Sequence, residues 1–225
     1  NRATLGGMTG NNSCGARSIR YGNMVHNVSS VEALLADGTH AHFKSVNGPP
    51  EDNLAYQHLV QKMLELGQRE ASEIRSRFPK LLRRVGGYNI DELIKEEPNM
   101  GRLLVGSEGT LGFFKRIHLD LQPIPPEKVL GVCHFPSFYE AMDATQHIVK
   151  LDPDAVELID RTMIELARDI PIFASTVNRF VRGEPEALLL VEFAGENGDQ
   201  QLRRLRQLVE LMGDLGFPDS VVEAS

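Results

Sequence analysis

The chain contains 225 residues, of which 41% are hydrophobic, and it carries 24 Lys and Arg residues against 31 Asp and Glu residues. Its net charge of −7 argues against a nucleic-acid partner, because proteins that bind phosphate backbones gather positive charge. No apolar run approaches the roughly 18 residues that a membrane helix needs, so we expect no membrane span. Cys14 and Cys133 match no metal or redox spacing, which fits a reducing, cytoplasmic location.

The first 22 residues are dense in Gly, Asn and Ser, which predicts loop structure. Within them, Cys14 belongs to a glycine-rich stretch over residues 3–15, and we interpret it as a small packing residue rather than a reactive thiol. The chain opens with Asn-Arg-Ala-Thr, which is not an initiator sequence. We therefore expect it to be an internal piece of a longer protein.

A β-hairpin is predicted next. Residues 28–35 are apolar and β-branched, and residues 36–39 place Asp-Gly at the centre of a turn, so residues 40–46 can return as the second strand. His40 and His42 share one face of that strand and either face solvent or chelate a metal. The solvent-facing arrangement is favoured, because the sequence offers no nearby Cys or carboxylate partner.

Residues 53–82 then change to a helical period, with Gly67 permitting a break and Pro79 marking a kink or boundary. Six basic and two acidic residues stand between Arg69 and Arg84. They form either a solvated face, which is the simpler interpretation, or a patch that steers an anionic substrate. Asp91 is expected to cap a short helix that follows.

A second glycine-rich stretch lies at residues 104–114, where we predict an apolar strand, a turn of small residues and a second apolar strand. Ser107 is not a nucleophile elbow, and no Walker motif is present. Backbone N–H groups in such turns bind anions or the polar edge of a flat heterocycle, and Glu108 supplies the one fixed charge. We expect the two glycine-rich stretches to line one ligand.

Three prolines within residues 123–126 predict a stiff linker and a domain boundary. Beyond the linker, the alternation of strands and helices predicts a sheet covered on one side by helices. The apolar positions of the last helix share one face, namely Leu202, Leu205, Leu208, Val209 and Met212. The expected elements are strands at 129–135, 155–158 and 188–193, helices at 137–150, 160–167 and 199–215, and a strand beginning at 221.

Taken together, these motifs resemble the FAD-linked oxidases, flavoproteins with the fold of vanillyl-alcohol oxidase and of bacterial D-lactate and glycolate dehydrogenases. The helical insert is similar to that of the long, D-2-hydroxyglutarate dehydrogenase-like members, which are fused to an iron–sulfur module. The motifs that carry the resemblance are Thr4-Leu5-Gly6-Gly7, Asn11-Asn12-Ser13-Cys14-Gly15, Arg17, Tyr21-Gly22, Leu35-Ala36-Asp37-Gly38-Thr39, Arg84-Val85-Gly86-Gly87-Tyr88-Asn89 and Gly106-Ser107-Glu108-Gly109-Thr110-Leu111-Gly112.

The resemblance implies an α+β protein. Residues 1–122 would form the second lobe of a PCMH-type FAD-binding domain with a helical insert at about 50–84. A Pro-rich linker at 123–127 would lead into part of a ferredoxin-like, substrate-binding α+β cap domain at 128–225. The implied reaction is oxidation of a D-2-hydroxy acid by hydride transfer to flavin N5. Electrons would leave to a quinone, a cytochrome or an electron-transfer protein.

The resemblance also implies which residues contact FAD. Two departures from the family pattern affect packing beside the flavin: Ser13-Cys14 replaces Ala-Ser or Ala-Gly, and Phe113-Phe114 replaces an aliphatic pair. The implied FAD contacts are Ala3, Thr4, Gly6, Gly7, Asn11, Asn12, Ser13, Cys14, Gly15, Glu108, Gly109, Thr110, Gly112, Phe113 and Phe114.

Other parts of the family's machinery are expected outside this chain: the pyrophosphate-binding loop, the His/Glu metal and catalytic cluster, and the iron–sulfur cysteines. The chain by itself is therefore expected to bind FAD weakly or not at all, and to hold no metal, catalytic acid or catalytic base. A basic cap residue is a candidate for the substrate carboxylate, although surface solubility explains each more simply. The candidates are Arg161, Arg168, Arg179 and Arg182.

Two other functions stay open. One is a relative of the NADPH-dependent reductase of a peptidoglycan precursor, which lacks a cap of this type, so strand–helix repeats after Pro126 count against it. The other is a non-catalytic subunit that keeps the fold without the flavin. The resemblance is compatible with a homo-oligomer and with a cytoplasmic protein that is peripheral at the inner membrane.

Overall fold

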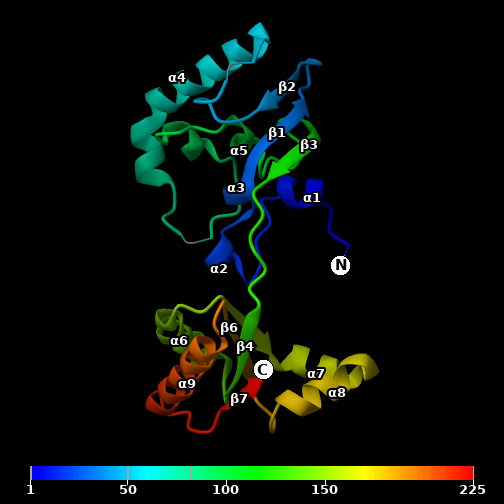
Figure 1. Ribbon diagram of the computed structural model, residues 1–225, viewed down its shortest axis with the longest axis vertical. Coiled ribbons are helices and arrows are strands. Elements are labelled where there is room, and N and C mark those ends of the chain that lie inside the picture. Colours follow the sequence, from blue (N-terminus) through cyan, green and yellow to red (C-terminus); the bar gives the residue numbers. More distant parts are fainter. Residues whose placement is uncertain (1, 50, 82, 225) are drawn as a thin grey trace. The chain divides into compact units, whose positions relative to one another are not determined.

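The computed structural model describes residues 2–49, 51–81 and 83–224. Contacts between residues divide the chain into two compact units, Asn1–Gln122 and Pro123–Ser225, which Figure 1 colours in sequence order from blue to red. Each unit has its own hydrophobic core. Over the described ranges, no helix has the length and apolar composition that crossing a bilayer requires.

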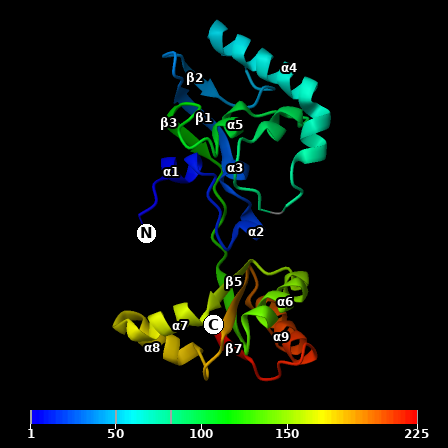
Figure 2. The same ribbon diagram turned by 180° about the vertical axis from the view of Figure 1, so that it is seen from behind.

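The first unit contains a three-stranded antiparallel sheet in the order β2-β1-β3. β1 (Val28–Leu34) and β2 (His40–Phe43) pair across the Asp-Gly turn, so the predicted hairpin is confirmed. β3 (Phe113–Leu119) pairs with the other edge of β1. One sheet face is buried under apolar side chains from α4 and α5, the two helices beside the sheet in Figures 1 and 2. The helices of this unit are α1 (Leu5–Gly10), α2 (Ser18–Tyr21), α3 (Met24–Asn27), α4 (Leu54–Arg77), the 3-10 helix η1 (Ile90–Ile94) and α5 (Met100–Leu104).

The long helix α4 runs through Gly67 without interruption, so the break that this glycine permitted does not occur. A Cβ at Gly67 would lie 2.6 Å from the Cβ of Leu93, which shows that the glycine lets α4 approach η1 closely. The helix begins after Asn53, whose side chain accepts the Tyr56 N–H, and it ends before Pro79. Residues 79–81, near the end of the stretch predicted to be helical, are not helical, and Leu82 lies outside the described residues.

Three local predictions in this unit are wrong, and polar caps explain the first two. Residues 5–10 form a helix rather than a loop, with the Thr4 hydroxyl accepting the Gly7 N–H. The apolar strand predicted to begin at residue 104 is absent, because the Asn99 side chain caps the first turn of a helix over residues 100–104. Asp91 caps nothing, since it lies inside η1 and pairs with Arg84 at 2.6 Å.

The second unit is built on a four-stranded antiparallel sheet in the order β5-β6-β4-β7, which confirms the predicted strands. Leaving aside the helices between β5 and β6, the elements follow as strand, helix, strand, strand, helix, strand, which with this sheet order is a ferredoxin-like α+β arrangement. The strands are β4 (Glu127–Phe135), β5 (Ala155–Asp160), β6 (Ala187–Gly195) and β7 (Val221–Ala224).

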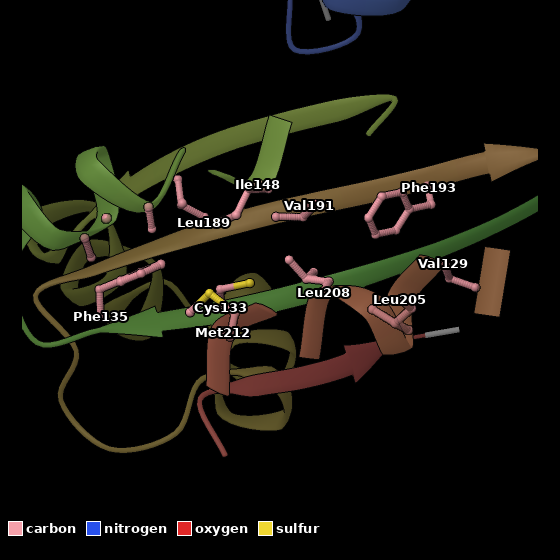
Figure 3. Packing of buried hydrophobic residues seen from close by; sticks show 13 residues of the cluster. Val129, Cys133, Phe135, Ile148, Leu189, Val191, Phe193, Leu205, Leu208 and Met212 are labelled. Carbon is pink, nitrogen blue, oxygen red and sulfur yellow. The ribbon is translucent and has the colours of Figure 1, made fainter. Parts of the chain in front are cut away.

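Helices α6 (Phe138–Ile148) and α9 (Gly198–Asp214) cover one face of this sheet, and the 3-10 helix η2 (Val149–Leu151) follows α6. Alternate residues of the two central strands point toward these helices, as the strand period of two requires. Leu202 is 38% exposed, so the buried face of α9 is narrower than predicted. Figure 3 shows this core, which includes Val129, Cys133, Phe135, Ile148, Leu189, Val191, Phe193, Leu205, Leu208 and Met212.

The opposite face of the sheet is covered as well, so the expectation that helices lie on one side only is wrong. Between β5 and β6 the chain forms α7 (Arg161–Asp169) and α8 (Pro171–Phe180), which pack on Val132 and Leu188. The sequence analysis did not predict α8. A helix is recognised in a sequence when its apolar residues share one buried face, but the apolar Ile172 and Phe173 of α8 are exposed, at 77% and 51%.

Candidate functional site

Two glycine-rich segments meet beside the start of β3 in the first unit. The Gly106 N–H donates to the Thr9 carbonyl at 3.0 Å, and the Glu108 N–H donates to the Gly10 carbonyl at 2.9 Å. These bonds hold α1 against the turn that precedes β3. A cavity of about 430 Å³ lies between the two segments and is lined by Gly6, Gly7, Gly10, Asn11, Glu108, Gly109, Gly112, Phe113 and Phe114.

Gly10 lines this cavity although it was not among the expected cofactor contacts. The signal for it was present, because it lies in the same glycine-rich stretch as Gly6 and Gly7. Seven of the expected contacts do not line the cavity: Ala3, Thr4, Asn12, Ser13, Cys14, Gly15 and Thr110.

Several of these seven residues have other roles in the first unit. Asn12 is fully buried, and its side-chain oxygen accepts the Val25 N–H at 3.0 Å. The Thr110 hydroxyl donates to the Ser107 carbonyl at 2.6 Å and lies 2.9 Å from the Tyr88 hydroxyl. Cys14 is exposed, so its interpretation as a packing residue is wrong.

The glycines of the cavity fall into two groups. A Cβ at Gly112 would lie 3.1 Å from the Leu34 carbonyl oxygen, so packing within the protein favours glycine there. A Cβ at Gly6 or Gly10 would meet no atom within 4 Å, although both residues lie in helix α1. Glycine in a helix costs about 1 kcal/mol relative to alanine, so the fold itself gives no reason for these two glycines.

The turn between α5 and β3 has a strained backbone at one residue. Glu108 has a positive φ angle of 49°, a region that residues other than glycine rarely adopt, whereas Gly106 and Gly109 adopt φ angles of 80° and 82° without strain. Backbone strain of this kind tends to occur at ligand sites, where surrounding contacts hold it in place. The two hydrogen bonds to α1 supply such contacts.

The basic residues between Arg69 and Arg84 do not form one solvated face. Arg69 pairs with Glu70 and Arg77 pairs with Glu73 on the exposed side of α4. The Arg84 side chain, by contrast, is only 20% exposed. The simpler interpretation of this stretch is therefore wrong for Arg84.

The structure places the two histidines of the possible metal pair, His40 and His42, on β2. His42 Nε2 lies 2.8 Å from the Ser30 hydroxyl, and His42 Nδ1 lies 3.8 Å from a Glu51 oxygen, so a carboxylate does stand nearby. His40 is exposed. Among the residues that the structure describes, no three or more His, Cys, Asp and Glu side chains form a group that could hold a metal ion.

Two of the four candidate arginines in the second unit have carboxylate partners within the unit. Arg161 donates to Glu165 at 2.7 Å and to Glu186 at 2.5 Å, and Arg168 pairs with Glu184 at 2.8 Å. A cavity of about 360 Å³ between α7, α8 and the sheet is lined by apolar side chains and Thr176. Because no cation lines it, this cavity does not suit a carboxylate substrate.

Comparison with known proteins gives a consistent result. Residues 124–224 match the family described as FAD linked oxidases, C-terminal domain, and residues 1–44 match the family described as FAD binding domain. The chain is 30% identical over 220 residues to the D-2-hydroxyglutarate dehydrogenase of Pantoea ananatis, an alignment that covers 92% of this chain and 21% of that protein. It is 25% identical over 206 residues to the D-lactate dehydrogenase of Archaeoglobus fulgidus, covering 91% and 35%.

The chain spans about a fifth of the length of the D-2-hydroxyglutarate dehydrogenases that it matches, including the protein from Haemophilus influenzae at 29% identity and 95% coverage of this chain. A solved structure of alkyldihydroxyacetonephosphate synthase matches with a TM-score of 0.55 at 15% identity, over 99% of this chain and 34% of that one. At this low identity, the likeness to the solved structure concerns the fold alone. Both family matches and the homologous dehydrogenases agree that the chain carries an FAD-binding domain segment and a C-terminal domain of the FAD-linked oxidases.

Proposed function

We propose that the cavity between the two glycine-rich segments holds part of an FAD cofactor, and that the whole protein oxidises a D-2-hydroxy acid. The relatives named above are D-2-hydroxyglutarate and D-lactate dehydrogenases, which supports this class of substrate. The observation that carries the cofactor assignment is the pair Gly6 and Gly10. The fold does not need glycine at these two positions of α1. Without a side chain, each leaves the backbone beside the cavity open to close approach by a ligand.

The lining of the cavity fits a flat ring system better than a phosphate. The Phe113 ring is 69% exposed at the cavity wall and offers an apolar face for stacking. The Asn11 amide offers hydrogen bonds to ring nitrogens and carbonyls. The Glu108 carboxylate repels a phosphate. We therefore assign this cavity to a ring of FAD, with its pyrophosphate lying elsewhere.

In the proposed reaction, bound FAD supplies the hydride acceptor, and the residues of this chain position it. The proposal includes an electron acceptor outside this chain, which is a quinone, a cytochrome or an electron-transfer protein. It also includes the iron–sulfur module of the long family members and a location peripheral to the inner membrane. Of the four cap arginines, Arg179 and Arg182 are the better candidates for the substrate carboxylate, because Arg161 and Arg168 already pair with glutamates.

The two alternative functions are less well supported. The second unit carries the cap-type sheet and helices that the peptidoglycan-precursor reductase lacks, and it matches the C-terminal domain of FAD linked oxidases. A non-catalytic subunit without flavin has no need for open glycines beside the cavity. The flavin spectrum of the purified protein distinguishes this alternative from the proposal.

The test introduces the substitution Gly10→Ala into the full-length protein. We expect the variant to unfold at equal or higher denaturant concentration, because alanine favours a helix by about 0.5–1 kcal/mol over glycine. We also expect its FAD affinity to fall, because the new methyl group occupies the ligand's side of α1. Flavin fluorescence quenching measures the affinity, and urea unfolding of the FAD-free protein measures the stability.

The matched control is Gly213→Ala in α9, where an added Cβ also meets no atom within 4 Å. It should change stability in the same direction and leave FAD affinity unaltered. Bleaching of the flavin by a panel of D-2-hydroxy acids tests the reaction. A wild-type protein that binds no FAD, or whose flavin no D-2-hydroxy acid bleaches, contradicts the proposal.

A further inference from the structure

Arg84 lies where several segments of the first unit converge. Its carbonyl oxygen accepts the Asn23 side-chain N–H at 2.9 Å and, at a longer 3.5 Å, that of Asn12. Asn23 and Asn12 are 1% and 0% exposed, so the donors of both bonds are buried. The backbone of residue 84 is thereby tied to the segment that ends the first glycine-rich stretch.

The Arg84 side chain reaches in a second direction. Its Nη2 donates to Asp91 at 2.6 Å and to the side-chain oxygen of Asn89 at 3.2 Å, and its guanidinium lies 4.8 Å from the ring centroid of Phe78. Charge-assisted bonds from a partly buried guanidinium are the stronger kind of hydrogen bond. They orient the Asn89 amide.

Asn89 completes the connection to the second glycine-rich stretch. It is 1% exposed, and its Nδ2 donates to the Val105 carbonyl at 2.7 Å, one residue before Gly106. A Cβ at Gly106 would lie 3.2 Å from the Cβ of Asn12, so the two stretches are in close contact at this point. A continuous set of hydrogen bonds thus runs from Asn12 through Arg84 and Asn89 to the turn that lines the cavity.

We propose that Arg84 and Asn89 are positioning residues, which set the spacing between the two glycine-rich segments and thereby the width of the cofactor cavity. The inference rests on the proposed function, because it concerns the same cavity. Neither residue lines the cavity, so each acts through the backbone that it holds. Close-packed contacts do not stretch, and a shift of less than 1 Å in one wall changes the fit of a flat ligand.

The test replaces Asn89→Ala in the protein at its full natural length and measures FAD affinity together with the visible circular dichroism of the bound flavin. We expect affinity to fall about tenfold or more, because removing a buried amide leaves the Val105 carbonyl unpaired and frees the turn. The visible dichroism should weaken in the flavin that still binds, since a wider cavity holds the ring less rigidly.

The matched control is Asn99→Ala. Asn99 is 8% exposed, its Nδ2 donates to the Ser29 carbonyl at 2.9 Å, its Oδ1 caps α5, and it does not line the cavity. Because its loss removes the cap as well as the Ser29 bond, it should lower the stability of the FAD-free protein by at least as much as Asn89→Ala does, and leave FAD affinity within about twofold of wild type. A second series compares Arg84→Lys with Arg84→Met. Because lysine keeps a charged donor, the FAD affinity of the Arg84→Lys variant should lie between those of wild type and Arg84→Met.

The outcomes separate the two proposals. A wild-type protein that binds no FAD overturns the proposed function and this inference with it. Wild type that binds FAD, with Asn89→Ala binding equally well, overturns the inference alone. The inference is also overturned if the Asn89 and Asn99 variants lose affinity equally, or if Arg84→Lys behaves as Arg84→Met does, because either result indicates a merely structural role.

Discussion

Cys14 and Cys133 occupy opposite environments. Cys14 is exposed in the turn after α1, whereas Cys133 is fully buried on β4, where burial raises the pKa of its thiol to about 12. Only a thiolate reacts readily with alkylating reagents. We expect a maleimide to label Cys14 within minutes in the native protein and Cys133 only after denaturation. Peptide mass spectrometry reads the sites, and native labelling of Cys133 would show that the core of the second unit opens.

His26 gives the first unit a dependence on pH. Its Nδ1 accepts the Asn23 N–H at 2.9 Å, and partial burial, followed by the charge of Lys95, lowers its pKa below the ordinary 6.5. The unfolded chain therefore binds more protons than the folded chain just below pH 6.5. It follows that the free energy of unfolding falls as the pH drops through 6.5 toward the lower, folded-state pKa.

The variant His26→Asn tests this dependence, because an asparagine oxygen can accept the same N–H without titrating. Urea unfolding between pH 7.5 and about 5 should show a shallower loss of stability in the variant than in wild type. Identical pH slopes for the two proteins would mean that other groups account for the dependence.

At the scale of elements, Gly67 shows where packing overrides helix propensity. On propensity alone, Gly67→Ala in the middle of α4 should stabilise the protein by about 1 kcal/mol. The new Cβ would instead lie 2.6 Å from the Cβ of Leu93, so α4 and η1 must separate. We expect a net loss of about 1–3 kcal/mol in the free energy of unfolding, measured by urea titration.

Gly213→Ala in α9, where the added Cβ meets open space, is the control and should be neutral or stabilising. If both substitutions raised stability alike, the close approach of α4 to η1 would not be a feature of the protein in solution.

Sequence patterns predicted the elements whose burial is regular. The run Leu188–Val191 is apolar on both faces, as a strand between two layers of helices requires, and it is a strand. The run Leu103–Val105 has the same apolar character, yet residues 103 and 104 are helical because Asn99, outside the run, caps the turn before them. A short apolar run does not distinguish the two states.

The candidate site was predictable to a similar extent. The glycines at positions 6, 7, 109 and 112 stood out in the sequence, and they line one cavity. Arg84 began one of the motifs that resemble the family, but the charged stretch around it gave no sign of its role. Its contacts with Asn23 and Asn89 arise only when separate segments fold together, so local patterns cannot reveal them.

At the scale of the whole molecule, the order of strands has a consequence for synthesis on the ribosome. β4 is an inner strand of the second unit and the first one to be made, but its two partners are β6 and β7, the last strands in the sequence. At about 5–20 residues per second, translation leaves β4 without its β6 partner for several seconds. An apolar strand with both edges unpaired is prone to pair with another chain. The nascent protein, rather than the finished one, is therefore the state in which this sheet is most open to aggregation.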